Sequence, residues 1–329
     1  MREPSAGAPV LVAPDSFKGT FTAAEVGAAI ARGLRSAGLP VDLCPVADGG
    51  EGTLAVLSAA LGAGLKTVEV SDPLGRPVTA SFALAGDVAI IETAAASGLQ
   101  LVGPQERDAV AASTAGTGEL ILAALDAGAR TIELGVGGSA TTDGGAGAVG
   151  VIERAGGLRR ARLIVLCDVR TPFEQAAEVF ATQKGASAAD IALLTQRLNE
   201  MASALPRDPR GVLMTGAAGG LSGGLWAALG AELVAGASFV LDAVDFAARA
   251  AAARAVLTGE GRLDRQSLAG KLVSEVAARA RRAGTPCHAV VGTLALDRAD
   301  ARELGLGEVM EASTLEALER TGRRLAEII

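Results

Sequence analysis

The feature that most constrains the fold is a repeated unit of short apolar strand, glycine-rich polar loop and helix. Residues 10–13 form the first expected strand, and Thr22, with Glu25 three residues later, is placed to cap a helix over residues 23–36. A second strand over residues 41–46 and a second apolar helix repeat the pattern. Strands that are joined by helices favour a parallel sheet with helices on both faces.

The middle of the chain has a different pattern. A turn-rich connector at residues 71–78 precedes alternating strands at 79–84 and 88–92, whereas strand–helix–strand segments return after residue 255. We therefore predict an α/β protein of two domains. Residues 1–74 and 245–329 would form a discontinuous, doubly wound domain of the Rossmann or flavodoxin-like kind, and residues 75–244 an inserted mixed α/β domain. A ligand-binding cleft is expected at their junction.

Composition excludes several classes of function. Hydrophobic residues make up 50% of the 329 residues, yet no apolar run reaches the roughly 20 residues that cross a bilayer, and the first residues lack the apolar centre of a signal peptide. A net charge of −7 with 2% aromatic residues argues against nucleic acid as a partner. The three dispersed cysteines suit a reducing compartment. We expect a cytoplasmic protein without membrane or nucleic-acid partners.

Composition also restricts the chemistry. The chain has no tyrosine, and its single histidine, His288, lies in an apolar run at 286–291 that is typical of a buried strand. We interpret His288 as a structural residue. A histidine-based triad or metal cluster is therefore excluded, and any acid or base must be Asp, Glu or Lys.

Acidic and basic side chains gather in glycine-rich loops that follow the expected strands. Glycine lets a backbone approach a ligand closely, and successive backbone N–H groups can hold phosphate oxygens. Carboxylates beside such loops can hold Mg²⁺, which usually keeps several waters. Phosphoryl transfer needs this combination together with a cationic side chain and a base. The loops in question are 14–20, 47–53, 135–147, 183–185, 216–224 and 258–264, and Asp168 follows a further strand at 163–167.

Other interpretations of these loops exist. Glycine is abundant throughout the chain, so any one loop can be an ordinary turn. The sequence has no Walker phosphate loop, which excludes the kinases that carry one. The pattern Gly135-x-Gly137-x-x-Ala140, followed by Asp168, imitates a dinucleotide fingerprint, but the spacing to Asp168 is too long. An NAD(P)-dependent 2-hydroxyacid dehydrogenase and a non-catalytic sensor of small acids remain as alternatives.

The loops and their neighbours together resemble the bacterial type I glycerate kinase family. The resemblance covers most of the chain in the family's order. It rests on APDSFKGT (13–20), PVADGGEGT (45–53), ETAAASGL (92–99), GTGELI (116–121), GVGGSATTDGGAG (135–147), QKGA (183–186), GAAGGLSGGL (216–225) and LTGEGRLDRQSLAGK (257–271). It implies a two-domain α/β fold and Mg²⁺-dependent transfer of the ATP γ-phosphate to D-glycerate, commonly at the 2-hydroxyl. A homodimer is a further expectation.

Two departures from the family accompany the resemblance. The chain is shorter than expected between Gly150 and Leu163, and Thr142 stands where asparagine is more usual. A surface hairpin could be lost without consequence for the site, because loops tolerate deletion. The change at Thr142 affects local hydrogen bonding, because a hydroxyl lacks the paired donor and acceptor of an amide.

Roles follow for the loop residues as hypotheses. Catalytic roles are expected for Lys18, Asp48, Asp143, Asp168, Arg262 and Lys271, with Asp168 or Asp143 as the base and the cationic residues as clamps for the substrate carboxylate or the phosphates. Asp48 and Glu51 are the expected metal ligands. Contacts with ATP are expected from Gly135, Gly137, Gly138, Ser139, Gly216, Gly219, Gly220, Gly259 and Glu260. Contacts with D-glycerate are expected from Asp15, Ser16, Lys18, Gly49, Gly50 and Arg262.

Overall fold

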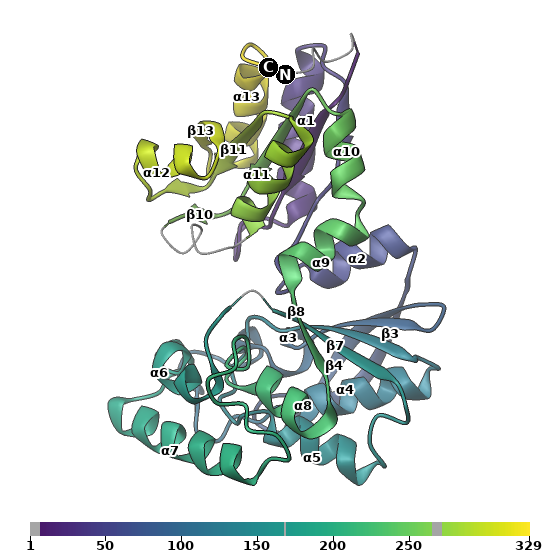
Figure 1. The fold of residues 1–329 in the computed structure, drawn as a ribbon, viewed down its shortest axis with the longest axis vertical. Coiled ribbons are helices and arrows are strands. Elements are labelled where there is room, and N and C mark those ends of the chain that lie inside the picture. Colours follow the sequence, from purple (N-terminus) through teal and green to yellow (C-terminus); the bar gives the residue numbers. More distant parts are fainter. Residues whose placement is uncertain (1–6, 168, 265–271) are drawn as a thin grey trace. The chain divides into compact units, whose positions relative to one another are not determined.

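A computed structural model describes residues 7–167, 169–264 and 272–329. Contacts between backbone positions divide the chain into two compact units. Unit 1 comprises Met1–Asp48 and Ala237–Ile329, and unit 2 comprises Gly49–Gly236. Figure 1 shows both units in the colours of the sequence, so that the purple start and the yellow-green end of the chain appear together in unit 1.

Unit 1 is built on a sheet of five parallel strands in the order β13-β11-β9-β1-β2. Numbered along the chain within this unit, the order is the 2-1-3-4-5 of flavodoxin-like sheets. The predicted doubly wound α/β class is therefore confirmed. The strands are β1 (Val10–Pro14), β2 (Val41–Leu43), β9 (Ala255–Gly259), β11 (Cys287–Val291) and β13 (Leu306–Glu311).

Alternation within strand β1 explains why helices cover both faces of this sheet. Val10 and Val12 pack with α1 (Ala23–Ser36) and α13 (Leu315–Leu325) on one face. Leu11 and Ala13 pack on the other face with α9 (Gly236–Ala243), α10 (Phe246–Ala252) and α11 (Leu272–Ala283). Because every second side chain points to the same face, a strand without polar positions requires cover on both sides.

Helix α1 begins and packs as its sequence indicates. Thr22 accepts a hydrogen bond from the backbone N–H of Glu25, and the Glu25 carboxylate accepts one from the backbone of Thr22, which is the predicted capping box. Further along, Gly33 faces α13 so closely that an added Cβ would lie 2.8 Å from the backbone nitrogen of Arg323. The two helices, purple and yellow in Figure 1, are therefore in backbone contact.

Unit 2 contains a mixed sheet of six strands in the order β3-β4-β5-β6-β7-β8. The pairs β3–β4 and β4–β5 are antiparallel, and the other pairs are parallel. A mixed sheet in the middle segment confirms the predicted class of this part of the fold. The strands are β3 (Gly64–Ser71), β4 (Pro77–Ala85), β5 (Val88–Glu92), β6 (Thr131–Gly135), β7 (Arg162–Cys167) and β8 (Glu232–Ala235).

Helices also surround the sheet of unit 2. One face packs in a continuous apolar core with α4 (Ala115–Asp126), α5 (Ala146–Arg154) and α8 (Leu221–Leu229). A separate cluster around Phe173 holds α6 (Ala176–Phe180) and α7 (Ala188–Ala204). The remaining elements are α2 (Thr53–Leu61), α3 (Ala94–Ser97), α12 (Arg298–Glu303), the 3₁₀ turns η1 (Leu99–Leu101), η2 (Phe173–Gln175) and η3 (Thr182–Lys184), and the short strands β10 (Arg262–Leu263) and β12 (Thr293–Leu294).

The compact units end at different residues from the domains expected from the sequence. We expected domain boundaries after residues 74 and 244, whereas the chain passes from one compact unit to the other after Asp48 and after Gly236. Strand β3, which the sequence analysis did not identify, pairs along its whole length with β4, and α2 packs on β4 and β5. Residues 49–71 therefore belong with the mixed sheet of unit 2.

His288 lies in strand β11 as expected from its apolar surroundings. Its Nδ1 accepts a hydrogen bond of 3.0 Å from the backbone nitrogen of Glu308 in the neighbouring strand β13. Burial lowers the pKa of His288, against the opposing effect of the Glu308 carboxylate. These contacts are those of a side chain that ties two strands together.

Candidate functional site

A cavity of about 380 Å³ opens in unit 1 beyond the carboxyl ends of the parallel strands. The loops after β1 and β9 form most of its wall. Asp48 from the loop after β2, Leu272 of α11 and the segments after β11 and β13 also line it. Strands β1 and β9 are the neighbours at which a sheet of this order reverses the direction of its connections. The cavity therefore occupies the position at which doubly wound sheets bind ligands.

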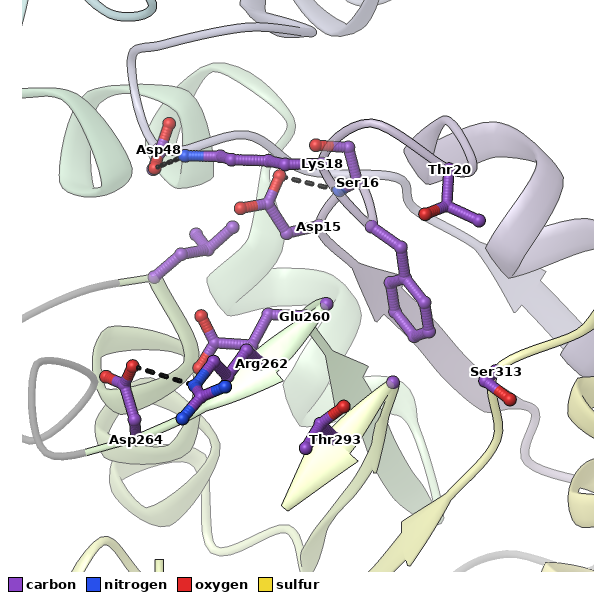
Figure 2. A pocket seen from close by; sticks show the side chains of 14 residues that line it. Asp15, Ser16, Lys18, Thr20, Asp48, Glu260, Arg262, Asp264, Thr293 and Ser313 are labelled. Atoms are coloured by element: carbon purple, nitrogen blue, oxygen red, sulfur yellow. Dashed lines mark hydrogen bonds and ion pairs between the residues drawn. The ribbon is translucent and has the colours of Figure 1, made fainter. Parts of the chain in front are cut away.

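Lys18 lies close to the carboxylates of Asp15 and Asp48 in the wall of this cavity (Figure 2). The Lys18 Nζ donates to an Asp48 oxygen at 2.9 Å, and the buried Asp15 carboxylate accepts from the backbone nitrogen of Ser16 at 2.7 Å. The backbone nitrogen of Asp15 donates to the carbonyl oxygen of Gly259 at 2.8 Å, which fastens the loop after β1 to the end of β9. Residues that were expected in the site from the loops at 14–20 and 47–53 therefore lie close together.

The charges in the cavity influence one another. Burial and then the Asp48 carboxylate raise the pKa of Asp15 well above its ordinary value, and Glu260 acts in the same direction. Burial works to lower the pKa of Lys18, but the Asp48 and Asp15 carboxylates outweigh it and raise that pKa. Lys18 is therefore a stable cation, and Asp15 is an acid whose proton is held more tightly than usual.

Further polar groups line the cavity. Arg262 forms an ion pair with Asp264 at 3.5 Å, and the Ser16 hydroxyl is buried without a hydrogen-bond partner among the described residues. The sequence analysis did not select Thr20, Thr293 and Ser313, whose hydroxyl groups also line the cavity (Figure 2). Thr20 belongs to the motif at 13–20 but was given no role, and the only signal for Thr293 and Ser313 was a position after a strand, which many residues share.

In unit 2 the predicted loops of two motifs pack against each other. A Cβ added to Gly135 would lie 2.8 Å from the Gly49 carbonyl oxygen, and one added to Gly137 would lie 2.8 Å from the Gly50 Cα. A side chain at either position would therefore push the loop at 49–52 away from the loop at 135–147. Glycine is needed here because two backbones meet.

The segment after strand β5 fixes the same loop from another side. The backbone nitrogen of Thr93 donates to Gly135 at 2.9 Å, that of Leu99 donates to Gly138 at 2.7 Å, and that of Ala140 donates to Ser97 at 2.9 Å. The motif at 92–99 therefore has a structural role, because its backbone hydrogen bonds support the loop at 135–147.

Asp143 holds the far end of this loop together. Its carboxylate accepts hydrogen bonds from the backbone nitrogens of Thr114, Gly145 and Gly147 at 2.9 to 3.1 Å, and from the Thr114 hydroxyl at 2.8 Å. The backbone nitrogen of Gly144 donates to Gly219 at 3.1 Å. The loop at 216–220, with Gly216, Gly219 and Gly220, therefore belongs to the same cluster of motifs.

The predicted site residues divide between the two units. The cavity of unit 1 is lined by Asp15, Ser16, Lys18, Asp48, Glu260 and Arg262, and Gly259 ends the adjoining strand β9. Asp168 and Lys271 lie outside the described residues. Unit 2 contains Gly49, Gly50, Glu51, Gly135, Gly137, Gly138, Ser139, Asp143, Gly216, Gly219 and Gly220.

Within residues 7–167, 169–264 and 272–329, no three His, Cys, Asp or Glu side chains are grouped closely enough to enclose a metal ion. In the same part of the chain, no helix has the length and apolar character that crossing a membrane requires.

Comparison with known proteins identifies the family. The family described as "Glycerate kinase family" matches residues 10–155 and 151–327. A glycerate kinase of Bacillus subtilis strain 168 is 38% identical over 374 aligned positions, which cover 97% of each chain. A glycerate 2-kinase of Escherichia coli K12 is 37% identical and covers 93% of this chain and 90% of its own.

A solved structure agrees with these sequence relatives. It is a crystal structure of a protein from Salmonella typhimurium LT2, provisionally named glycerate kinase 2, which is 34% identical, covers 98% of both chains and superposes with a TM-score of 0.83. Matches of this length and identity extend over both units. This chain belongs to the glycerate kinase family and is a kinase.

Proposed function

We propose that this protein transfers the γ-phosphate of ATP to the 2-hydroxyl of D-glycerate, giving 2-phosphoglycerate and ADP. Family membership supports the reaction, and the name of the Escherichia coli relative, a glycerate 2-kinase, favours the 2-position. The observation that carries the proposal is the cavity of unit 1, in which Lys18 lies between carboxylates at the ligand-binding edge of a flavodoxin-like sheet.

The cationic side chains of the cavity suit an acidic substrate. D-Glycerate carries a carboxylate, and Arg262 and Lys18 both line the cavity. The planar guanidinium of Arg262 can make paired hydrogen bonds to a carboxylate, whereas the Lys18 ammonium acts as a point charge. We assign Arg262 to the substrate carboxylate and Lys18 to the charge that develops on the transferred group.

Among the side chains that line the cavity, we assign Asp15 as the general base. Its carboxylate is buried at 4% exposure, and its pKa is raised toward the range in which proton transfer is effective. In the reaction, the substrate hydroxyl oxygen bonds to the γ-phosphorus and loses its proton to Asp15, while the bond from that phosphorus to the bridging oxygen breaks and ADP leaves. Asp143, which we predicted as an alternative base, already accepts four hydrogen bonds from unit 2.

The donor set of the cavity fits a magnesium ion. Mg²⁺ prefers one or two carboxylates together with waters. Asp15, Asp48 and Glu260 lie near enough to raise the pKa of the first of them, so a divalent cation would relieve their mutual repulsion. We propose Asp48 and Glu260 as its ligands in this cavity. Glu51, which belongs to unit 2, stays a prediction as a ligand. When bound, Mg²⁺ would neutralise charge on the phosphates of ATP.

The loops of unit 2 suit the phosphates of the nucleotide. In the 135–147 loop Gly137 is half-buried and Gly138 is exposed, and Gly138 adopts a positive φ of 62°. Successive backbone N–H groups in such a conformation can bind anionic oxygens.

An assay of the purified protein tests the proposed function. ATP consumption should depend on D-glycerate and on Mg²⁺, and EDTA should abolish it. NMR of the product should show phosphate on the 2-position. Oxidation or reduction of NAD(P) with a 2-hydroxyacid, or binding of glycerate without any turnover, would contradict the proposal in favour of the dehydrogenase or the sensor.

Replacing Asp48 by Asn tests the cavity. The substitution removes the charge beside Lys18 and a proposed magnesium ligand, so turnover should fall by about a hundredfold or more while the far-UV circular dichroism is unchanged. Activity close to that of the original protein would remove Asp48 from the site. A cytoplasmic location agrees with the three buried cysteines, Cys44, Cys167 and Cys287. A homodimer stays a prediction.

A further inference from the structure

A buried lysine lies beneath the loop at 135–147 and has no role in the reaction described above. Lys184 ends the 3₁₀ turn η3 within the QKGA motif, and it is only 2% exposed. Its Nζ donates to the Ser139 hydroxyl at 3.1 Å and to the Thr141 carbonyl oxygen at 2.5 Å. Both acceptors belong to the loop, one on each side of Ala140, so Lys184 fixes the backbone at this point.

We propose that Lys184 is a positioning residue for ATP: it holds the loop at 139–141 from beneath, and its charge favours binding of the nucleotide phosphates to that loop. The inference rests on the proposed kinase function. It concerns a residue that does not touch the reacting atoms and acts through the loop that it supports.

The charge of Lys184 is incompletely compensated by the protein. An ammonium group has three donors, and two acceptors account for two of them. Within the described part of the chain, Lys184 forms no ion pair with a carboxylate. Burying a cation without a partner costs free energy, so a nearby anionic ligand would be favoured.

Other polar groups of the loop also favour an anionic ligand. The hydroxyl groups of Thr141 and Thr142 are buried, at 0% and 2% exposure of the residues, and neither has a hydrogen-bond partner among the described residues. Buried hydroxyls without partners are unusual in a finished core. Together with the glycines at 137 and 138, they supply donors on the loop whose backbone Lys184 holds.

Titration of Lys184 gives a signal that can be measured. Burial lowers the pKa of Lys184 to about 7, against the opposing effect of the Asp143 carboxylate. A further charged side chain at this turn is Arg107, which donates to the Gln183 carbonyl oxygen. Because a bound polyanion stabilises the ammonium form, ATP should raise this pKa, and binding near pH 8 should be accompanied by proton uptake.

Calorimetry on the full chain tests the inference. ATP binding is measured at pH 8 in two buffers of different ionisation enthalpy, for the original protein, Lys184→Met and Lys66→Met. Lys66 is an exposed lysine on strand β3 of the same unit, so its replacement controls for the loss of one positive charge. The original protein and Lys66→Met should take up protons, whereas Lys184→Met should not, and its affinity for ATP should be at least about tenfold lower.

Kinetics separates this inference from the proposed function. Lys184→Met should raise the KM for ATP by about tenfold or more, with a smaller change in the KM for glycerate. Ser139→Ala, which keeps the lysine but removes one acceptor, should raise the KM for ATP less. An original protein without glycerate kinase activity would contradict the proposed function. An active original protein whose Lys184→Met variant keeps both the KM for ATP and the proton uptake would contradict the role of Lys184, as would a rise confined to the KM for glycerate.

Discussion

Two buried carboxylates have raised pKa values with different consequences. Asp15 and Glu133 are both buried, and burial raises the pKa of each. They differ in their surroundings, because Asp15 lines the cavity of unit 1, whereas Glu133 lies in the central strand β6 of unit 2. One change of pKa therefore concerns catalysis and the other concerns stability.

Replacing Asp15 by Asn should lower kcat by about 10²- to 10⁴-fold, because the substrate hydroxyl loses its proton acceptor. In the original protein kcat/KM should fall as the pH decreases, at a pH above the ordinary titration of an aspartate, because the protonated form of Asp15 cannot act as a base. The variant should lack this acidic limb. Asp126→Asn, at an exposed ion pair with Arg159, serves as the control and should leave both properties unchanged.

Replacing Glu133 by Gln should stabilise the protein at neutral and alkaline pH. Burial raises the pKa of Glu133 from 4.5 to about 7, so the unfolded chain releases this proton at lower pH than the folded chain does. The free energy of unfolding therefore decreases from about pH 4.5 upward, and the decrease is complete once the pH exceeds about 7.

Thermal unfolding of both proteins across this range measures the effect. The difference in Tm between Glu133→Gln and the original protein should be larger at pH 8 than at pH 4.5. A difference that is the same at both pH values would show that Glu133 ionises normally in the folded chain.

At the scale of elements, the contact between α1 and α13 depends on one missing side chain. An added Cβ at Gly33 would lie 2.8 Å from the backbone nitrogen of Arg323, and backbone cannot move aside as a flexible side chain can. Gly33→Ala should therefore destabilise the protein by about 1 to 3 kcal/mol, although alanine is the better helix former.

Gly150→Ala in helix α5 is the matched control for this change. Its added Cβ would meet only the end of the Arg154 side chain, at 3.2 Å, which can move. The substitution should stabilise the protein by about 0.5 to 1 kcal/mol, because the unfolded chain loses freedom. Denaturant unfolding of both variants decides the matter, since a stabilising effect of Gly33→Ala would mean that the two helices are not in close contact.

At the scale of the whole molecule, the compact units predict where the chain can be divided. Unit 2, Gly49–Gly236, is continuous in sequence and has its own apolar core. Produced alone, it should unfold cooperatively. The segment 75–244, taken from the sequence-based boundaries, should be less stable because it lacks strand β3 and helix α2.

Chemical unfolding of the two segments, followed by circular dichroism, makes this comparison. A lower midpoint for the segment 75–244 is the expected result. Equal midpoints would show that β3 and α2 add nothing to the stability of the mixed sheet, and a non-cooperative transition of Gly49–Gly236 would show that the unit depends on the rest of the chain.

Much of the architecture could be predicted from local sequence. Strand β1 and helix α1 lie where the apolar run and the capping residues Thr22 and Glu25 indicated. Strand β3 was missed because most of it is exposed at the edge of the sheet, so its residues carry little of the apolar signal that marks a buried strand. The first compact boundary, after Asp48, lies before this strand, whereas the domain boundary expected from the sequence lies after it.

Strand patterns, helix patterns and long motifs are local properties of the chain, so they predict the fold class, the family and the loops in which the polar residues gather. Which of those residues share a site depends on how the chain folds in space. The tertiary structure placed Asp15, Lys18 and Glu260 around one cavity, tied Asp143 into loop backbone, and put Lys184 beneath the loop that it supports. Asp15 and Glu260 are distant in sequence, and the order of strands in the sheet, which no single segment encodes, brings them together.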